Sequence, residues 1–239
     1  AVPSHWMSIL FDDAQPQSRL GADGHPARGE FLPAVPLPRR MLAGRRITYA
    51  APLRVGEALT RRSEIVAITP KEGRTGKLVF VTVRHTVTGP AGTVATEEQD
   101  IAYREAPTAT PKPEAPAPKP DAAWREPFTP DTVLLFRYSA LTFNGHRIHY
   151  DADYTRDVEG YPGLVVNGGL TTLMLLDAAT RHAPGATLRS ADIRTTRPLT
   201  CGRPAALAGA APAEDGTHTL WAEDDIGATA LRIIARFAP

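Results

Sequence analysis

Polar and apolar residues alternate along much of the first half of the chain. Valines at positions 79, 81, 83 and 87 fall on one face, with threonine and arginine residues between them. This period of two residues is typical of a strand that is buried on one side. A Gly-Pro-Ala-Gly turn follows at 89–92. The pattern predicts a returning strand at 93–103 and another strand at 63–69.

The second half combines one helix with further strands. Apolar residues at helical spacing predict a helix from Gly168 to His182, which a Pro-Gly pair at 184–185 ends. Strand patterns follow at 187–196, 204–210, 218–223 and 228–237. The first half offers only a poorer helix at 31–43, because three prolines interrupt it. The pattern as a whole predicts an α+β protein with antiparallel sheets.

A proline-rich segment divides the chain almost evenly. Residues 106–124 contain six prolines, a composition that excludes a helix or central strand and is typical of an extended linker. The two halves also share a short motif: Pro-Leu-x-x-Gly follows a strand-like run both at 52–56 and at 198–202. We interpret this as a faint internal duplication.

Composition restricts the classes of partner. The 239 residues are 42% hydrophobic and carry a net charge of +1, so nothing indicates a nucleic-acid surface. Cys201 is the only cysteine, which excludes an intrachain disulfide and fits a reducing compartment. There is neither a membrane-spanning apolar run nor a signal pattern. We therefore expect a cytoplasmic protein without a membrane partner.

The strongest chemical signal lies just before the predicted helix. Asn144, His146 and His149 fall within six positions, and the segment Tyr161–Gly169 then opens the helix with two glycines. An imidazole can take a proton from water, and a helix N-terminus presents unpaired N–H groups to an oxygen. This pairing suits a site that activates water beside a polarised carbonyl.

These segments resemble the active-site region of MaoC-like, or R-specific, enoyl-CoA hydratases of the hot dog superfamily. The spelling Thr-Phe-Asn-x-His-Arg-Ile-His-Tyr-Asp at 142–151 is closer to the subgroup of mesaconyl-CoA, itaconyl-CoA and type 2 hydroxyacyl-thioester hydratases or dehydratases. The stretch at 36–41 extends the similarity. The resemblance implies a double hot dog, with two antiparallel sheets that each wrap a central helix. We expect a non-catalytic domain at 1–105, a linker at 106–124 and a catalytic domain at 125–239.

The resemblance also implies a hydro-lyase that acts on an enoyl-CoA thioester. Asn144 falls at the family's aspartate, His149 at its histidine and Gly168 at its glycine. We expect His149 to carry the proton transfer, Asn144 to orient the water and the N–H of Gly168 to bind the thioester oxygen. No metal is implied, and no cofactor beyond the coenzyme A of the substrate.

Two departures from the family pattern bear on the substrate. An amide cannot be a general base, but a neutral Asn144 would tolerate a second carboxylate on the acyl chain, as in mesaconyl-CoA or itaconyl-CoA. Asn167 stands where relatives usually have histidine. The substrate-binding residues we expect are His146, Arg147, Val166, Asn167, Gly169, Arg39 and Arg40.

Other interpretations remain open from the sequence. His146, His149 and Asp151 could hold the metal of a hydrolase. Asn144 could instead cap a turn, and Arg147 could be a surface residue. The chain could also be a thioesterase, or bind acyl thioesters without turnover, because a fold does not fix a function. A homodimer is the expected assembly.

Overall fold

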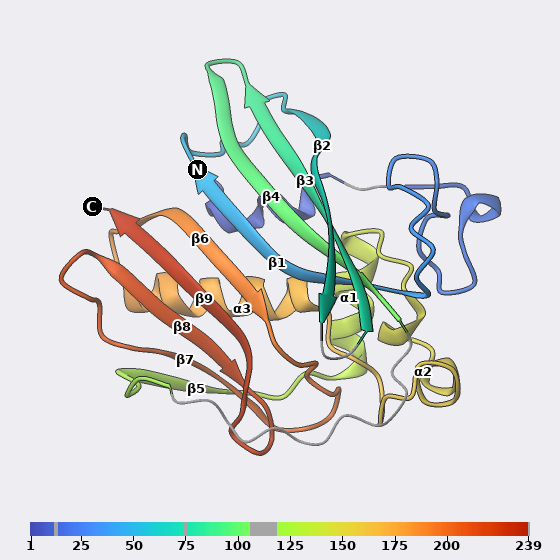
Figure 1. Cartoon of the computed structure of the whole chain (residues 1–239). Coiled ribbons are helices and arrows are strands. Elements are labelled where there is room, and N and C mark those ends of the chain that lie inside the picture. The colour runs from blue at the N-terminus through green and yellow to red at the C-terminus, as the bar shows by residue number, and fades with distance from the viewer. Residues whose placement is uncertain (12–13, 74–75, 106–118, 239) are drawn as a thin grey trace.

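The computed structural model describes residues 1–11, 14–73, 76–105 and 119–238. Within these ranges, nine antiparallel strands form one sheet in the order β2-β3-β4-β1-β6-β9-β8-β7-β5 (Figure 1). The strands are β1 (Arg39–Tyr49), β2 (Thr60–Gly73), β3 (Gly76–Gly89), β4 (Gly92–Arg104), β5 (Trp124–Phe128), β6 (Thr187–Thr195), β7 (Ala205–Gly209), β8 (Thr217–Glu223) and β9 (Thr229–Ala238).

Helices lie on one face of this sheet and beside one end of it. The α-helices are α1 (Thr132–Leu141), α2 (Ala152–Asp157) and α3 (Gly168–His182), and the 3-10 helices are η1 (Ser4–Ile9), η2 (Gln17–Arg19) and η3 (Arg147–His149). The predicted helix from Gly168 to His182 is confirmed as α3. No helix of the described residues is long and apolar enough to cross a membrane.

The two halves of the sheet share one strand order. The first half runs β1-β4-β3-β2 and the second β6-β9-β8-β7, and β5 extends the outer edge of the second half. The expected pair of separate sheets was wrong, because β1 and β6 pair antiparallel from Gly44 opposite Arg194 to Thr48 opposite Ser190. Without this pairing, β1 and β6 would each expose the backbone N–H and C=O groups of one strand edge. Pairing with each other satisfies those groups in both strands.

The repeated Pro-Leu-x-x-Gly motif occupies equivalent places in the two halves. It follows β1 in one half and β6 in the other, with Leu53 and Leu199 both buried. Gly56 and Gly202 both adopt positive φ, at 88° and 80°, a conformation that favours glycine. The structure therefore supports the internal duplication that the sequence indicated.

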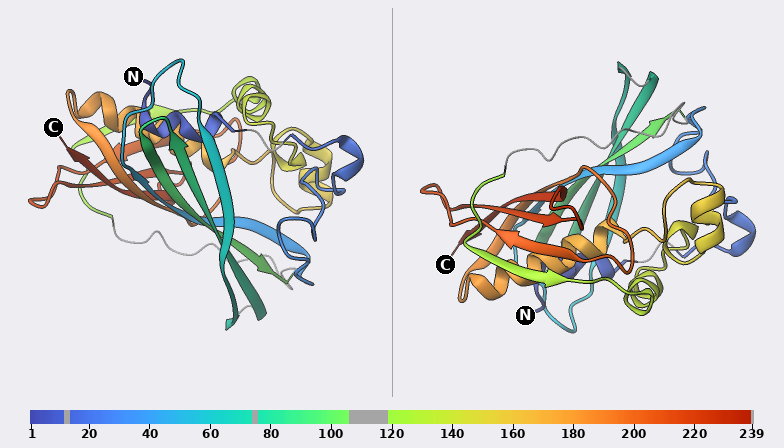
Figure 2. Two further views of the ribbon diagram at one scale, coloured as in Figure 1. Left: turned by 90° about the horizontal axis from the view of Figure 1, so that it is seen from above. Right: turned by 90° about the horizontal axis from the view of Figure 1, so that it is seen from below.

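The same correspondence identifies the first half's counterpart of α3. The N–H of Val166, before α3, donates to Leu199 O at 2.9 Å, and the N–H of Val2, before η1, donates to Leu53 O at 2.8 Å. Both helices lie on the same face of the sheet (Figure 2). The weak helix expected at 31–43 was wrong: three prolines prevent it, and its last residues belong to β1 instead.

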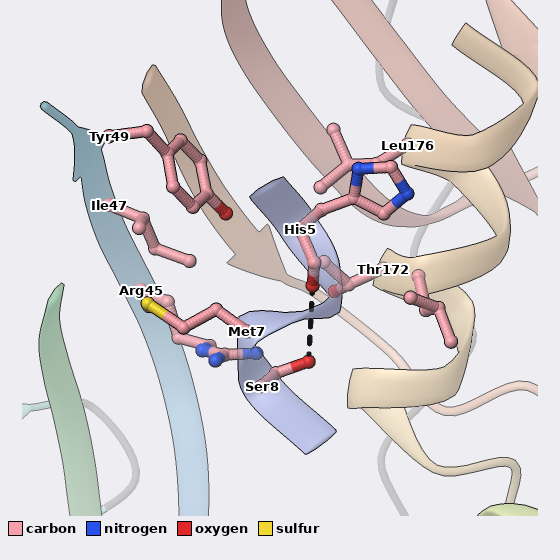
Figure 3. Close-up of a pocket in the computed structure, with 9 residues that line it drawn as sticks. His5, Met7, Ser8, Arg45, Ile47, Tyr49, Thr172 and Leu176 are labelled. Atoms are coloured by element: carbon pink, nitrogen blue, oxygen red, sulfur yellow. Dashed lines mark hydrogen bonds between the residues drawn. The ribbon is translucent and has the colours of Figure 1, made fainter. Parts of the chain in front are cut away.

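The main core lies between this helix pair and the sheet. Leu170, Leu175 and Leu176 of α3 are buried in it. Between the two helices, His5 Nε2 of η1 lies 2.5 Å from Asp177 Oδ1 of α3. Figure 3 shows side chains of η1 between those of β1 and α3, around a cavity of about 10 Å³. That volume is no larger than a single water needs, so the contact between η1 and α3 is close packed.

Most of the proposed linker, residues 106–118, lies outside the described residues. Trp124, its last residue, already belongs to β5, which pairs with β7 from Trp124 opposite Gly209 to Phe128 opposite Ala205. Before β5, Lys119 Nζ lies 2.5 Å from Glu223 Oε1 of β8. The chain therefore rejoins the sheet at the edge farthest from the first half's β2.

Candidate active site

The polar cluster and the start of α3 open onto the same cleft. This open cleft has a volume of about 2560 Å³ and reaches from the N-terminal loops, past the beginning of β1, to the segment after β6. The predicted site residues that line it are Arg39, Arg40, Asn144, His146, His149, Val166, Asn167, Gly168 and Gly169. Arg147 is the one predicted site residue that is not among its lining residues.

His149 ends η3 and is buried. Its Nδ1 lies 2.7 Å from the carbonyl oxygen of Val165, so Nδ1 carries the proton and donates it to this bond. Burial lowers the pKa of His149 to about 4, although the bond to Val165 acts in the opposite direction. The ring is therefore neutral near pH 7, with the lone pair of Nε2 free to accept a proton.

The N-terminus of α3 is open to a ligand. Its N-cap residue is Asn167, whose side chain makes no capping hydrogen bond to the helix. The first intrahelical bond recorded after the cap is from Thr171 N to Asn167 O. The N–H groups at the start of the helix, including that of Gly168, thus remain available, and the helix dipole favours negative charge there.

The two glycines at this N-terminus have different roles. A Cβ at Gly169 would lie 2.2 Å from the hydroxyl oxygen of Tyr138, so packing requires glycine at this position. A Cβ at Gly168 would meet nothing closer than Thr195 Oγ1 at 3.9 Å. Packing alone does not require glycine at 168, which agrees with the close approach of a ligand there.

Asn144 forms a turn. Its Oδ1 accepts the backbone N–H of His146 at 3.0 Å, and its own N–H donates to Ser139 O at 2.9 Å. Such a turn is a usual place for asparagine. The side chain holds the loop that presents His146, and whether it also orients water stays a prediction.

The side chain of Arg147 bonds neighbouring residues of its own segment. Its Nε and Nη2 donate to Asp151 Oδ2 at 3.0 and 2.7 Å, and its guanidinium lies 4.0 Å from the centre of the Tyr154 ring. Asp151 also caps α2 by accepting the N–H of Tyr154. These bonds give Arg147 a structural role, and substrate binding by Arg147 stays a prediction. Among the described residues, the group that could hold a metal includes His146 but neither His149 nor Asp151.

Asn167 is 2% exposed and only partly satisfied. Its Nδ2 donates to Ser139 Oγ at 3.3 Å. Its Oδ1 is buried, and no partner for it is found among the described residues. A buried acceptor without a partner costs free energy, which a donor on a bound substrate would recover.

Two site residues were missed by the sequence analysis. Asp23 and His25 belong to an N-terminal loop that lines the cleft, and Asp23 Oδ2 lies 3.1 Å from His25 Nδ1. Burial by itself raises the pKa of Asp23, but the hydrogen bonds from His25 hold it well below its usual range. The only signal was the short run Asp-Gly-His at 23–25, which resembles many turns.

The same loop creates a group that could hold a metal. One ligand atom each from Asp23, His25 and His146 lie within 4.8 Å of one another. This set differs from the His146, His149 and Asp151 set considered from the sequence. Burial first, and then the neighbouring histidines, lower the pKa of His146 to about 3, so its ring is a neutral donor or ligand near pH 7.

The charge of the cleft is positive on balance. Eight arginines line it against five carboxylates. Arg39 Nη2 donates to Glu159 O at 3.1 Å. The guanidinium of Arg40 interacts electrostatically with Asp23, and no side-chain hydrogen bond or ion pair is found for it within the described part of the chain. A cleft of this kind suits a ligand that carries phosphates or carboxylates.

Comparisons with solved structures identify the fold. A MaoC-like dehydratase from Phytophthora capsici matches with a TM-score of 0.67 at 14% identity, over 98% of this chain and 90% of that one. The HtdX protein of Mycobacterium tuberculosis matches with a TM-score of 0.64 at 18% identity, over 99% and 88%. These likenesses show the MaoC-like hot dog fold.

Comparisons of sequence identify the family. A mesaconyl-C(4)-CoA hydratase from Chloroflexus aurantiacus is 49% identical over 183 residues, which are 76% of this chain and 65% of that protein. A mitochondrial hydroxyacyl-thioester dehydratase type 2 from Schizosaccharomyces pombe is 48% identical over 50 residues, 21% of this chain and 17% of that protein. The chain thus spans less than two thirds of these relatives' lengths. The family model of hydroxyacyl-thioester dehydratase type 2 matches residues 4–201, and the chain belongs to that family.

Proposed function

We propose that this chain is a hydro-lyase that adds water to an enoyl-CoA thioester or removes it. One observation carries the proposal: a neutral, buried His149 with a free Nε2 shares a cleft with the uncapped N-terminus of α3. Hydration needs a base for water and a donor for the thioester oxygen, and these two groups supply them.

The chemistry follows from the geometry. His149 Nε2 takes a proton from water while the water oxygen bonds to the β-carbon of the enoyl group. The π electrons of the double bond move onto the thioester oxygen, where the N–H of Gly168 and the helix dipole stabilise the negative charge. The imidazolium of His149 then gives the proton to the α-carbon, which completes the hydration and restores the neutral ring.

The substrate class is proposed from charge and similarity. The 49% identity to a mesaconyl-C(4)-CoA hydratase supports a dicarboxylic acyl group. Asn144 adds no negative charge to the cleft, and Arg40 offers a guanidinium that interacts electrostatically with Asp23 but forms no ion pair among the described residues. Arg40 suits the second carboxylate better than Arg147, whose guanidinium already bonds Asp151. Arg39 remains a candidate for a coenzyme A phosphate.

The division of labour between the halves is also a proposal. Residues 125–239 carry His149 and α3, whereas residues 1–105 supply the opposite wall of the cleft with Arg39 and Arg40. A homodimer would cover apolar residues of α1 and the following loop that are exposed in the chain, such as Phe136 and Phe143. Sedimentation at several protein concentrations tests that assembly.

A panel of enoyl-CoA esters, with and without a second carboxylate, tests the activity. The expected result is loss of enoyl-thioester absorbance with formation of the hydroxyacyl-CoA, fastest for a dicarboxylic ester. Release of free coenzyme A would indicate a thioesterase instead. Tight binding of the esters with no turnover would indicate a binding protein and would overturn the proposal.

A further inference from the structure

A loop of the N-terminal half, at 21–26, lies against the catalytic loop at 144–147. The backbone N–H of Arg147 donates to Asp23 O at 2.9 Å, and Arg147 Nη1 donates to Ala22 O at 3.1 Å. The first loop comes before β1 and the second comes after α1, so they belong to different halves of the chain. Two hydrogen bonds therefore join the halves at this point of the cleft.

Two glycines bring the backbones of the two loops into contact. Gly24 has φ +83°, and a Cβ there would lie 1.9 Å from the carbonyl oxygen of Gly145. A Cβ at Gly145 would in turn lie 2.7 Å from Gly24 O. A side chain at either position would push the loops apart, so the separation of the loops is set by the backbone.

This contact brings three metal-ligating side chains together. One ligand atom each from Asp23, His25 and His146 lie within 4.8 Å of one another. The ring centres of His25 and His146 are 4.0 Å apart. All three residues are half-buried and line the cleft. The N-terminal half supplies two members of the group and the C-terminal half supplies the third.

The spacing of the ligand atoms is close to what a metal ion requires. Zinc bonds to imidazole nitrogen and carboxylate oxygen are about 2.0–2.2 Å long, which places two ligand atoms of a tetrahedral site roughly 3.4 Å apart. Asp23 Oδ2 and His25 Nδ1 are already 3.1 Å apart. The widest separation in the group closes to that value when side chains move by about 1.4 Å or less.

Hydrogen bonds hold the ligands in place from behind. Asp23 Oδ1 accepts the backbone N–H of His25 at 3.0 Å, and its other oxygen, Oδ2, faces the imidazole of His25. Asn144 Oδ1 accepts the backbone N–H of His146 at 3.0 Å, which fixes the turn that presents His146. Bonds of this kind orient the ligands of metal sites and raise the affinity for the ion.

We propose that Asp23, His25 and His146 form a binding site for one divalent transition-metal ion of the zinc class, which joins the N-terminal loop to the catalytic loop. Two imidazole nitrogens and a carboxylate suit zinc, cobalt or nickel, whereas magnesium and calcium prefer oxygen ligands alone. Water from the cleft completes the coordination, because the protein supplies three ligands. This site does not depend on the proposed hydro-lyase function.

The charge of Arg40 limits the affinity of the site. Its guanidinium interacts electrostatically with both Asp23 and His146. A positive charge at this place repels a cation, so zinc binds less tightly than it would beside a neutral side chain. Arg40→Gln is therefore expected to tighten zinc binding by about three-fold or more.

Zinc titration of the untagged full chain, followed by calorimetry and metal analysis, tests the site. Wild type is expected to bind one zinc per chain, and zinc is expected to raise its thermal midpoint. His25→Ala and His146→Ala are each expected to weaken zinc binding by at least about 10²-fold, since a direct ligand contributes more than its outer hydrogen bonds. Asp23→Asn keeps the shape of the side chain but not its charge, and is expected to weaken binding by about ten-fold or more.

Matched controls come from the far end of α3. His182 Nε2 lies 2.9 Å from Glu126 Oε1, which is also a histidine–carboxylate pair but lies outside the cleft. His182→Ala and Glu126→Gln are therefore expected to keep the wild-type zinc affinity. Weak binding of zinc to any such pair would be lost in these controls as well.

Three outcomes would overturn the proposal. Equal zinc affinity in wild type, His25→Ala and Asp23→Asn would place the bound ion elsewhere. Zinc binding that is lost in His149→Ala but kept in His25→Ala would place the ion on the group considered from the sequence. A folded wild type with a zinc Kd weaker than about 1 mM would mean that Asp23 and His25 only form a hydrogen-bonded turn. None of these measurements requires turnover, so failure of the site and failure of the proposed function are distinguished.

Discussion

The two halves of the sheet have the same strand order but carry different helices. In the second half, the helix after the Val166–Leu199 bond is α3, with 15 residues. In the first half, the helix after the Val2–Leu53 bond is η1, a 3-10 helix of six residues. A long helix has a substantial dipole and free N–H groups at its start, whereas a single short turn has little of either.

The helix starts differ in chemistry as well as in length. Gly168 and Gly169 open α3 beside His149, but Pro3 and Ser4 open η1, where proline has no N–H to offer. His5 of η1 is used to bind Asp177 of α3. The two halves therefore differ: the start of α3 leaves N–H groups without a side-chain cap, whereas η1 packs against α3 through His5.

The largest effect is expected from removing the base of the second half. His149→Ala should lower kcat by at least about 10³-fold and leave the fold intact, because Nε2 of His149 is the proposed acceptor of the water proton. The matched change in the first half is His5→Ala, which should lower the thermal midpoint through loss of the bond to Asp177 but keep kcat per folded molecule. Equal kcat in wild type and His149→Ala would contradict the mechanism.

The first half has its own buried charge, which serves stability. Arg45 Nε lies 2.5 Å from Glu97 Oε1 between β1 and β4, and both side chains are buried. Glu97→Gln should lower the free energy of unfolding by about 3–5 kcal/mol, because Arg45 stays buried without its counter-charge. Glu98→Gln, on the half-exposed side of the same strand, should cost less than about 1 kcal/mol. Urea unfolding of the two variants measures the difference.

The sequence predicted the strands and α3 well because each has a strong local period. Strands expected at 63–69 and 93–103 correspond to β2 and β4, and α3 has the expected bounds. The joining of both halves into one sheet could not be predicted, since pairing between β1 and β6 depends on contacts about 145 residues apart, for which no local pattern exists.

Some residues of the candidate site could be predicted from the sequence, and others could not. His149 and Gly168 lie in two nearby segments that both match the family's active-site pattern, so their shared cleft could be anticipated. Asp23 and His25 could not, because only the folded chain brings their loop against Gly145. Arg147 was expected at the substrate, but its i,i+4 partner Asp151 already binds it. The spacing of residues within each motif therefore predicted which residues could belong to the site. Their final positions depend on contacts between distant segments of the chain.

The paired glycines of α3 offer a smaller effect that separates packing from chemistry. Gly169→Ala should destabilise the fold by about 1–3 kcal/mol, because its Cβ meets the hydroxyl of Tyr138, and adding Tyr138→Phe should recover much of the loss. Gly168→Ala should keep or slightly raise stability, by up to about 1 kcal/mol, since the free protein has room for a Cβ.

Activity should show the opposite order at these two positions. Gly168→Ala should lower kcat/KM by about ten- to a hundred-fold, because a methyl group would displace the thioester from the helix start. Thermal melts and kcat/KM for both variants are sufficient to check this. A Gly168→Ala protein with normal kcat/KM would mean that the thioester oxygen binds elsewhere.

The smallest effect concerns the charge of the catalytic loop. Asn144→Asp should keep the turn to the N–H of His146, since aspartate forms the same turn, but it adds a negative charge. At about 5 Å and an effective dielectric of about 20, repulsion of a substrate carboxylate is on the order of 3 kcal/mol before screening. We expect about 1–2 kcal/mol in practice, a five- to thirty-fold shift in relative kcat/KM from mesaconyl-CoA towards crotonyl-CoA.

Asn144→Ser, which retains a short side chain without charge, is the control and should leave that ratio near the wild-type value. An unchanged ratio in Asn144→Asp would mean that the substrate carboxylate lies far from this loop, and that Arg40 does not bind it beside His146.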